Sequence, residues 1–343
     1  VAGIAKNDDI VEIINSVMLD RRVVTFGDKL CHNMEGDKLQ STLPHYAYLR
    51  IADGCSNKCS YCAIPLIRGK MRSRKMENII EEAKKFAENG VKELVIVAQD
   101  VTAYGIDLYK KYALPDLLKQ LCKIDGIKWI RLLYCYPERM TDELIETIKT
   151  EDKVLNYIDI PIQHCNKEIL RNMYRGGDEQ SLRELFAKLR REIPGVVLRT
   201  TLITGFPGET EEQFSELAEF VNDIKFERLG CFAYSAEEDT PAAEMPDQVD
   251  EGERQRRADI ITGEQEIRMG EYYAGMVGNT YEVVCEGFDR YSDMYFGRSM
   301  HFAPEIDGMI YFTSTKEKRP VIGDFINVKI TDVLENNLLG EQV

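Results

Sequence analysis

Six short runs of apolar, β-branched or aromatic residues follow one another from residue 44 onward, and most of them are followed by a helical pattern. They span residues 46–51, 93–98, 128–134, 157–162, 196–203 and 228–234. Repeated strand–helix units imply a parallel sheet with the helices packed outside it. Because six units are fewer than the eight of a closed barrel, we predict an α/β fold with an open, partial (β/α)6 barrel.

The helices between these runs carry signals of their own. Two show an apolar face at helical spacing, made by Met76, Ile79, Ile80, Ala83 and Ala87 in one and by Leu182, Leu185, Phe186 and Leu189 in the other. A third begins at Thr210 with the form of a capping box, Thr-Glu-Glu-Gln, which satisfies backbone N–H groups at a helix start.

The two ends of the chain differ from this middle part. Residues 1–43 hold one apolar-periodic helix and a polar connection, which is too little apolar surface to fold alone. Residues 235–252 are acidic and contain Pro241 and Pro246, and residues 253–275 form a charged helical stretch. From residue 277 only short strand-like runs follow, at 280–284, 295–298, 309–313 and 325–330. Glycines punctuate these runs, so we predict a small all-β barrel.

Three cysteines, Cys55, Cys59 and Cys62, lie within eight residues directly after the first predicted strand. Thiolates are soft ligands that select zinc, copper(I) or iron–sulfur clusters. Three thiolates are one short of the four that close a structural zinc site, so an open coordination position suggests chemistry. The alternative is a zinc site completed by a distant ligand such as His164 or Cys165, although zinc motifs usually come as separated Cys-x-x-Cys pairs.

The composition indicates the cellular compartment of the protein and the type of binding partner that it favours. The chain has nine cysteines, an odd number, and the isolated ones lie in apolar contexts, which argues for a reducing cytoplasm and against a disulfide framework. No window approaches the length of a membrane span, so we expect no membrane partner. The net charge is −15. Because nucleic-acid affinity comes largely from basic residues, an acidic chain favours a basic partner.

Several polar residues fall where predicted strands end, the rim at which such folds place their sites. Gln99 ends the second strand, and it is suited either to hydrogen-bond a ligand or to cap the next loop. Gln163 and His164 follow the fourth strand, and a lone histidine is more often structural than a base. Arg199 is charged within an apolar run, where burial demands a substrate carboxylate, a cofactor group or a structural ion pair as partner.

A tight turn at Gly205, Pro207 and Gly208 precedes the capping box of the third helix. Such a turn lets the backbone approach an adenine or a ribose, although most such turns merely connect elements. Arg68, Arg72 and Arg74 form a basic run, which is usually a solvated face.

The spacing Cys-x3-Cys-x2-Cys, with the aromatic Tyr61 before the last cysteine, resembles the cluster loop of the radical S-adenosylmethionine (SAM) enzymes. The resemblance implies that Cys55, Cys59 and Cys62 hold one 4Fe-4S cluster, whose open iron chelates the amino and carboxyl groups of SAM. One-electron reduction then yields a 5'-deoxyadenosyl radical. It also implies SAM contacts for residues at the rim, which are Tyr61, Gln99, Gln163, Arg199 and Gly205.

Four further stretches resemble the methylthiotransferase branch of that family. They are residues 68–74, 97–105, 159–164 and 204–210. Within this branch, residues 103–109 and 234–242 look most like the RimO group. Those enzymes add a methylthio group to the β-carbon of one aspartate of ribosomal protein uS12. The C-terminal barrel resembles a TRAM domain, so the resemblance covers nearly the whole chain.

The resemblance divides the chain into four parts. We expect a remnant of an N-terminal methylthiotransferase domain with a linker at 1–43, a radical SAM domain at 44–252, a helical linker at 253–276 and a TRAM barrel at 277–343. The family's N-terminal domain holds a second 4Fe-4S cluster on three further cysteines. No such motif is present, and Cys31 matches none. We therefore expect a truncated form with one cluster, and the second cluster only in the full-length protein.

Two rival functions stay open. The first is the same chemistry on an adenosine of transfer RNA, but residues 277–343 carry eleven acids and six bases, a net charge of −5. A TRAM domain that serves RNA should be basic, whereas an acidic one suits a basic ribosomal protein, so nucleic acid is not the expected direct substrate. The second is a ribosome-associated module with structural zinc. A flavodoxin or ferredoxin is expected as the electron donor.

Overall fold

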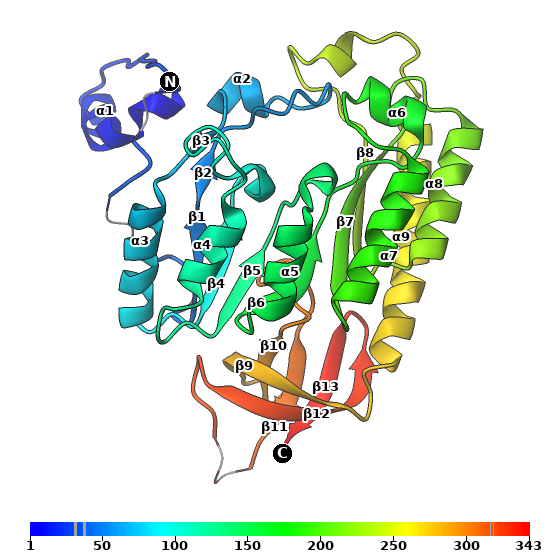
Figure 1. The fold of residues 1–343 in the computed structure, drawn as a ribbon. Coiled ribbons are helices and arrows are strands. Elements are labelled where there is room, and N and C mark those ends of the chain that lie inside the picture. The colour runs from blue at the N-terminus through cyan, green and yellow to red at the C-terminus, as the bar shows by residue number, and fades with distance from the viewer. Residues whose placement is uncertain (31–32, 37–38, 316, 318) are drawn as a thin grey trace.

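A six-stranded parallel sheet forms the larger body of the computed structural model, which describes residues 1–30, 33–36, 39–315, 317 and 319–343 (Figure 1). Cys31 lies outside the described residues. The strands pair in chain order and are β1 (Tyr46–Arg50), β4 (Glu93–Val97), β5 (Trp129–Leu132), β6 (Val154–Asp159), β7 (Val197–Thr204) and β8 (Arg228–Ala233). In the described part of the chain β1 and β8 do not pair, so the predicted open α/β barrel is confirmed.

Helices pack on the outside of this sheet, as Figure 1 shows. The main ones are α3 (Met76–Glu88), α4 (Leu114–Leu121), α5 (Asp142–Thr150), α7 (Glu179–Glu192) and α8 (Glu211–Ile224). Their apolar faces form one core with the strands, in which Ile79, Leu117 and Leu217 are fully buried. Each such side chain contributes about 1.5–3 kcal/mol. The capping box expected at Thr210 is present, because Thr210 and Gln213 satisfy each other's backbone N–H groups.

Shorter elements lie at the upper rim of the sheet and in the N-terminal segment. They are η1 (Ile4–Asp9), α1 (Ile10–Met18), the pair β2 (Ala52–Asp53) and β3 (Arg72–Ser73), α2 (Ile64–Arg68), η2 (Val101–Ala103), η3 (Pro137–Arg139), α6 (Lys167–Asn172) and η4 (Pro241–Glu244). The helix expected in the first 43 residues is α1, but it has no buried residue. No helix among the described residues has the length and apolarity to cross a membrane. The cytoplasmic location stays a prediction.

A closed five-stranded barrel follows the long helix α9 (Glu251–Ala274). Its strands are β9 (Thr280–Asp289), β10 (Met294–Ser299), β11 (Ile310–Thr313), β12 (Phe325–Leu334) and β13 (Asn337–Gln342). Helix α9, expected as a spacer, also packs its buried Ile261 into the core of the larger body. The five strands confirm the predicted all-β barrel. Helix α9 both packs on the outside of the parallel sheet and connects the sheet to the barrel.

Two sequence-based element predictions were wrong in detail. The fourth strand is β6, Val154–Asp159, three residues earlier than the predicted run 157–162. The residues after Asp159 are apolar because they are buried, as Ile160 and Ile162 are, although they lie beyond the strand. The fifth barrel strand, β13, was missed because only Leu338 and Gly340 of its six residues are buried, which leaves little apolar pattern to detect.

Buried charges join the small barrel to the lower end of the sheet. Arg298 of β10 donates to Glu93 of β4 at 2.8 Å and to Glu286 of β9 at 2.7 Å. Glu93 also accepts a hydrogen bond from Arg131 of β5 at 2.7 Å. Burial alone would raise the pKa of Glu93, but the two arginines outweigh it and hold its pKa at about 2. The C-terminal barrel therefore closes the lower end of the sheet, and the upper end carries the site.

Candidate active site

The three cysteines lie on the loop between β2 and α2, at the upper rim of the sheet. The loop begins at Gly54, whose φ is +74°, and a Cβ there would lie 2.5 Å from the carbonyl oxygen of Lys70. Only glycine avoids both the strained φ and this clash. Ser60 anchors the middle of the loop, because its N–H donates to Met173 O at 3.0 Å and its hydroxyl donates to Asn172 O at 2.7 Å.

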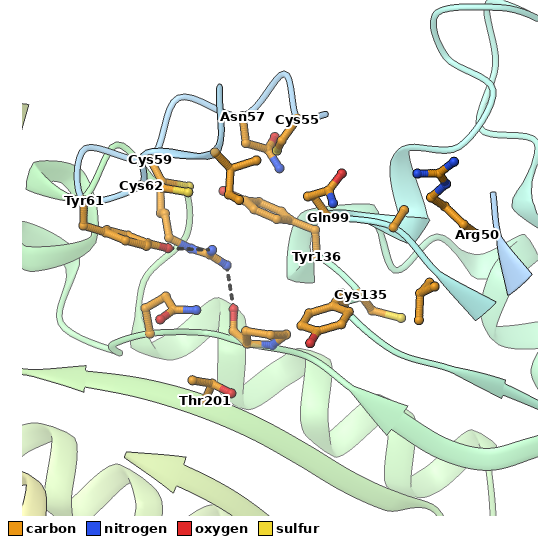
Figure 2. A pocket seen from close by; sticks show the side chains of 17 residues that line it. Arg50, Cys55, Asn57, Cys59, Tyr61, Cys62, Gln99, Cys135, Tyr136 and Thr201 are labelled. Atoms are coloured by element: carbon orange, nitrogen blue, oxygen red, sulfur yellow. Dashed lines mark hydrogen bonds between the residues drawn. The ribbon is translucent and has the colours of Figure 1, made fainter. Parts of the chain in front are cut away.

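A cavity of about 500 Å³ lies under this loop (Figure 2). All three cysteines line it, together with residues at or after the ends of β1, β4, β5 and β6 and with Thr201 inside β7. The lining residues are Arg50, Cys55, Asn57, Cys59, Tyr61, Cys62, Ile64, Val97, Ala98, Gln99, Tyr134, Cys135, Tyr136, Pro161, Gln163, Arg175 and Thr201. The carboxyl ends of parallel strands meet at one edge, which explains why segments so far apart in sequence share one cavity.

Two thiols of the loop, those of Cys55 and Cys62, have raised pKa values in the protein alone. Burial is the largest cause that raises the pKa of Cys55 to about 11, and the neighbouring Cys59 and Cys62 add to it. Burial likewise raises the pKa of Cys62. Because only thiolates bind a metal, loading this loop releases protons.

The donor set fits a cluster by its chemistry, but the side chains are not in ligand positions. Three soft ligands line one cavity. Among the described residues, no group of three or more His, Cys, Asp or Glu side chains is arranged to hold a metal ion. The three thiol side chains must therefore turn toward one point when a cluster binds. The buried Oε1 of Gln99 in the same cavity has no hydrogen-bond partner, which fits a ligand that donates to it.

The Tyr61 side chain lies beneath the cysteine loop (Figure 2), and Arg175 approaches its hydroxyl. The Arg175 guanidinium lies 4.2 Å from the ring centre of Tyr136, and its Nη1 is 3.4 Å from the Tyr61 hydroxyl. Its Nη2 donates to Pro161 O at 2.8 Å. Arg175 therefore ties the cysteine loop to the ends of β5 and β6 and leaves a positive charge beside Cys59.

A second polar network fixes the other end of the loop. Asn57 donates to Asp100 at 2.9 Å and accepts from Arg139 at 2.8 Å. Arg139 also donates to Asp100 at 2.5 Å. Asp100 in turn holds η2, accepting from the N–H of Ala103 at 3.2 Å. The loop is thus bonded to the ends of β4 and β5 on either side of the cavity.

Gln163 lines the cavity with a left-handed backbone, φ +71°. Its N–H donates to Thr201 O and its carbonyl accepts from Ile203 N–H, both at 2.9 Å, so β7 holds this conformation. A non-glycine residue in the left-handed region is strained, and such strain clusters at functional sites.

Two predicted cofactor residues lie elsewhere. Arg199 does not line the cavity but pairs with Asp159 at 2.8 Å, which is the structural ion pair named among its alternatives. Gly205 also lies outside the lining, because Arg254 of α9 packs against it and a Cβ would lie 2.3 Å from that residue's Cγ. The prediction of cofactor contacts for Arg199 and Gly205 is not supported by their positions.

The alternative zinc ligands are also elsewhere. His164 and Cys165 are fully buried and line no part of the cavity. Burial, and then the charge of Arg257, lowers the pKa of His164 to about 3. The basic run is not a solvated face either. Arg68 and Arg72 pair with Asp53, and Arg74 is buried beside Glu35 and Glu82.

Sequence reasoning missed several residues of the cavity. Arg50, Tyr136 and Arg175 line it, and no motif in the sequence marked them. The detectable signal was positional. Arg50 is the last residue but one of the first predicted strand, 46–51, and Tyr136 lies two residues after the third, 128–134. Arg175 comes after a short helix and carried no such signal.

Family comparisons agree with this geometry. A model of the radical SAM superfamily matches residues 49–221, and a model of the TRAM domain matches residues 277–343. The ribosomal protein uS12 methylthiotransferase RimO of Caldanaerobacter subterraneus subsp. tengcongensis is 48% identical over 99% of this chain and 77% of its own length. The RimO of Clostridium botulinum strain Hall is 50% identical over 89% of this chain and 68% of its own length.

The chain belongs to the RimO family of radical SAM methylthiotransferases. It is therefore an enzyme, and the non-enzymatic zinc module is excluded. Membership of the radical SAM superfamily implies a 4Fe-4S cluster and SAM as cofactors of this RimO-family chain.

Solved structures support the fold of this RimO-family chain. Coproporphyrinogen III oxidase HemN from Escherichia coli, described as a radical SAM enzyme, superposes with a TM-score of 0.51 at 18% identity over 67% of this chain and 54% of its own. The radical SAM methyltransferase TsrM from Kitasatospora setae superposes with a TM-score of 0.54 at 13% identity over 70% of this chain and 52% of its own. The chain thus spans about half of each of these proteins.

Proposed function

We propose that the chain generates the radical for transfer of a methylthio group to the β-carbon of an aspartate in ribosomal protein uS12. The observation that carries the proposal is the single cavity in which the cysteine loop meets Gln99 and Arg175. The relatives of about 50% identity, which are named as uS12 methylthiotransferases, support the choice of substrate.

In this proposal Cys55, Cys59 and Cys62 hold the cluster, and Tyr61, Gln99 and Gln163 contact SAM. When bound, the cluster and SAM would supply radical chemistry: with one electron from a reductant, SAM would be cleaved to methionine and a 5'-deoxyadenosyl radical able to take a hydrogen atom from the β-carbon. Gln99 accepts a hydrogen bond from the methionine amino group through its unpartnered Oε1. Arg175 keeps a positive charge at the loop, and the apolar wall of Ile64 and Val97 limits water near the radical.

We further propose that the complete reaction uses a second cluster whose ligands come from outside residues 1–343. The other described cysteines support this, because each lies in a different segment of the chain and each is at least partly buried. They are Cys122, Cys135, Cys165, Cys231 and Cys285. A flavodoxin or ferredoxin is the proposed reductant. The proposed domain boundaries remain 43/44, 252/253 and 276/277.

Metal analysis tests the first part of the proposal. Protein reconstituted anaerobically with iron and sulfide should be brown and hold about four irons per chain. Cys55→Ala, Cys59→Ala and Cys62→Ala should each lower the iron content strongly, whereas Cys122→Ala, a cysteine outside the cavity, should not. A colourless protein with one tightly bound zinc would contradict the proposal.

Substrate choice needs its own experiment. With reductant and SAM, addition of purified uS12 should increase the release of 5'-deoxyadenosine, and transfer RNA should not. Binding to uS12 should also exceed binding to transfer RNA at physiological salt. If transfer RNA binds with a steep salt dependence and uS12 does not bind, the rival substrate is the correct one.

A further inference from the structure

The charge of the cavity wall is one-sided. Among its described lining residues are two arginines, Arg50 and Arg175, and no aspartate or glutamate. Two guanidinium groups in a partly enclosed cavity demand negative partners, since burying an uncompensated charge is costly. The cavity is therefore built to receive anionic groups.

Among the described residues, neither guanidinium has a carboxylate as a hydrogen-bond partner. Nη2 of Arg50 donates to Met34 O at 3.3 Å, and its buried Nε has no partner. Arg175 donates to Pro161 O and approaches the Tyr61 hydroxyl. By contrast Arg139, at the same rim, is already neutralised by Asp100.

The proposed function brings two carboxylates into this cavity, one on the methionine part of SAM and one on the substrate aspartate. Arg175 lies beside Tyr61 and the loop of Cys59, which is the cofactor's side. Arg50 ends β1, and Figure 2 shows it at the opposite side of the cavity from Cys59 and Tyr61. Arg175 thus lies with Tyr61 on the cofactor's side of the cavity, and Arg50 is left to the substrate's side.

We propose, on the basis of the proposed function, that Arg50 binds the side-chain carboxylate of the substrate aspartate. The carboxylate carbon of aspartate is bonded directly to the β-carbon that reacts. A two-pronged guanidinium contact to that carboxylate therefore fixes the reacting carbon within one bond of the anchor. Arg50 acts as a specificity-determining residue, because neither the base of an adenosine nor the side chain of an asparagine carries a negative charge at the reacting group.

The backbone around Arg50 is suited to hold it still. The Arg50 N–H and C=O belong to β1, which pairs in register with β4, where Arg50 lies opposite Val97. Arg50 O also accepts a hydrogen bond from Nη1 of the buried Arg74 at 2.7 Å. The side chain therefore extends from a fixed strand end, and its Nε is free for a ligand.

Binding and isotope transfer test this role in protein loaded with its cluster and SAM. Calorimetry measures the affinity for two ligands, uS12 and uS12 whose target aspartate is replaced by asparagine. Each affinity is measured for the parent chain, Arg50→Ala and Arg50→Lys. Arg191→Ala, which removes an exposed arginine of α7, is the matched control. Deuterium at the β-carbon of the target aspartate should appear in 5'-deoxyadenosine.

The parent chain should bind the aspartate form roughly 10- to 100-fold more tightly than the asparagine form. Arg50→Ala should lose that preference, Arg50→Lys should keep part of it, and Arg191→Ala should keep all of it. Arg50→Ala should lose more of the parent chain's deuterium transfer than of its substrate-free release of 5'-deoxyadenosine.

Each contrary outcome has a separate meaning. If Arg50→Ala binds and discriminates as the parent does, the role of Arg50 is wrong while the proposed function stands. If Arg50→Ala loses SAM affinity but keeps the preference for aspartate, Arg50 serves the cofactor instead. If the parent chain neither binds uS12 nor transfers deuterium from it, the proposed function itself fails.

Discussion

Arg298 of the C-terminal barrel donates a hydrogen bond of 2.8 Å to Glu93 at the first residue of β4, and both side chains are 1% exposed. Removing one partner of such a pair leaves a buried charge without compensation. We expect Arg298→Met to lower the free energy of unfolding by about 3–5 kcal/mol in urea titrations. Arg290→Met, on the exposed turn after β9, should change it by less than about 0.5 kcal/mol. Equal effects of the two would show that the junction does not stabilise the fold.

Glu93 also predicts an acid-sensitive stability. Its pKa in the folded protein is about 2, lowered by Arg298 and Arg131 against the effect of burial, from an ordinary value of 4.5. A carboxyl with a lowered folded pKa stabilises the fold above its unfolded pKa, and this is lost as pH falls. The contribution should be complete above pH 4.5 and decline toward pH 2. Glu93→Gln should flatten that part of the stability curve, measured by urea unfolding at each pH, and an unchanged slope would contradict the assignment.

His164 should add acid sensitivity at higher pH. Its pKa is lowered from 6.5 to about 3 by burial and Arg257, with Glu209 3.7 Å from its Nε2. The unfolded chain gains the proton first, so the stabilising contribution of neutral His164 is present above pH 6.5 and declines as pH falls toward 3. His164→Gln should remove this decline. A nuclear magnetic resonance titration that shows His164 protonated at pH 6 in the folded protein would refute it.

Gly205 should be sensitive to substitution for a packing reason. Its φ is +68°, and a Cβ would lie 2.3 Å from Cγ and 2.9 Å from Cα of Arg254. Gly195 has nearly the same φ, +70°, but nothing within 4 Å of such a Cβ. Gly195→Ala should therefore cost about 1 kcal/mol for backbone strain alone, and Gly205→Ala clearly more, measured by thermal unfolding. Equal losses of stability in the two variants would show that Arg254 of α9 moves to accommodate the new methyl group at little cost.

Gln99 should contribute to SAM affinity and little to stability. Its buried Oε1 has no hydrogen-bond partner among the described residues, so a donor group of SAM would supply one. We expect Gln99→Leu to weaken SAM binding about 3- to 10-fold in equilibrium dialysis with cluster-loaded protein. The exposed Gln120→Leu on α4 serves as control and should bind SAM normally. An unchanged SAM affinity in Gln99→Leu would remove this residue from the cofactor set.

Local pattern was sufficient for the architecture and the cysteine loop. Period-2 and period-3.6 apolar patterns report burial directly, so five of the six sheet strands were predicted within two residues of their observed ends, and the capping box at Thr210 was correct. The pattern failed where burial and strand pairing do not coincide. Ile160 and Ile162 are buried beyond β6, and β13 has too few buried residues to stand out.

Proximity to the cysteine loop was decided by tertiary structure. Gln99, at the end of a predicted strand, and Arg199, within one, were both predicted to contact the cofactor. Gln99 lies past the end of β4 and lines the cavity, whereas Arg199 lies three residues into β7 and pairs with Asp159. The two residues differ in their position along the strand. An error of one or two residues in a predicted strand end changes that position, so the sequence does not give it reliably.

The sequence by itself determined that this chain forms a strand–helix barrel with a soft-ligand loop and a small β-barrel, because those features depend on neighbours in the chain. The tertiary structure alone decided that Arg50 and Arg175 share a cavity with the three cysteines and that no carboxylate lines its described wall. The balance of charge in a cavity is a sum over segments that meet only when the sheet has folded, so no single stretch of sequence contains it.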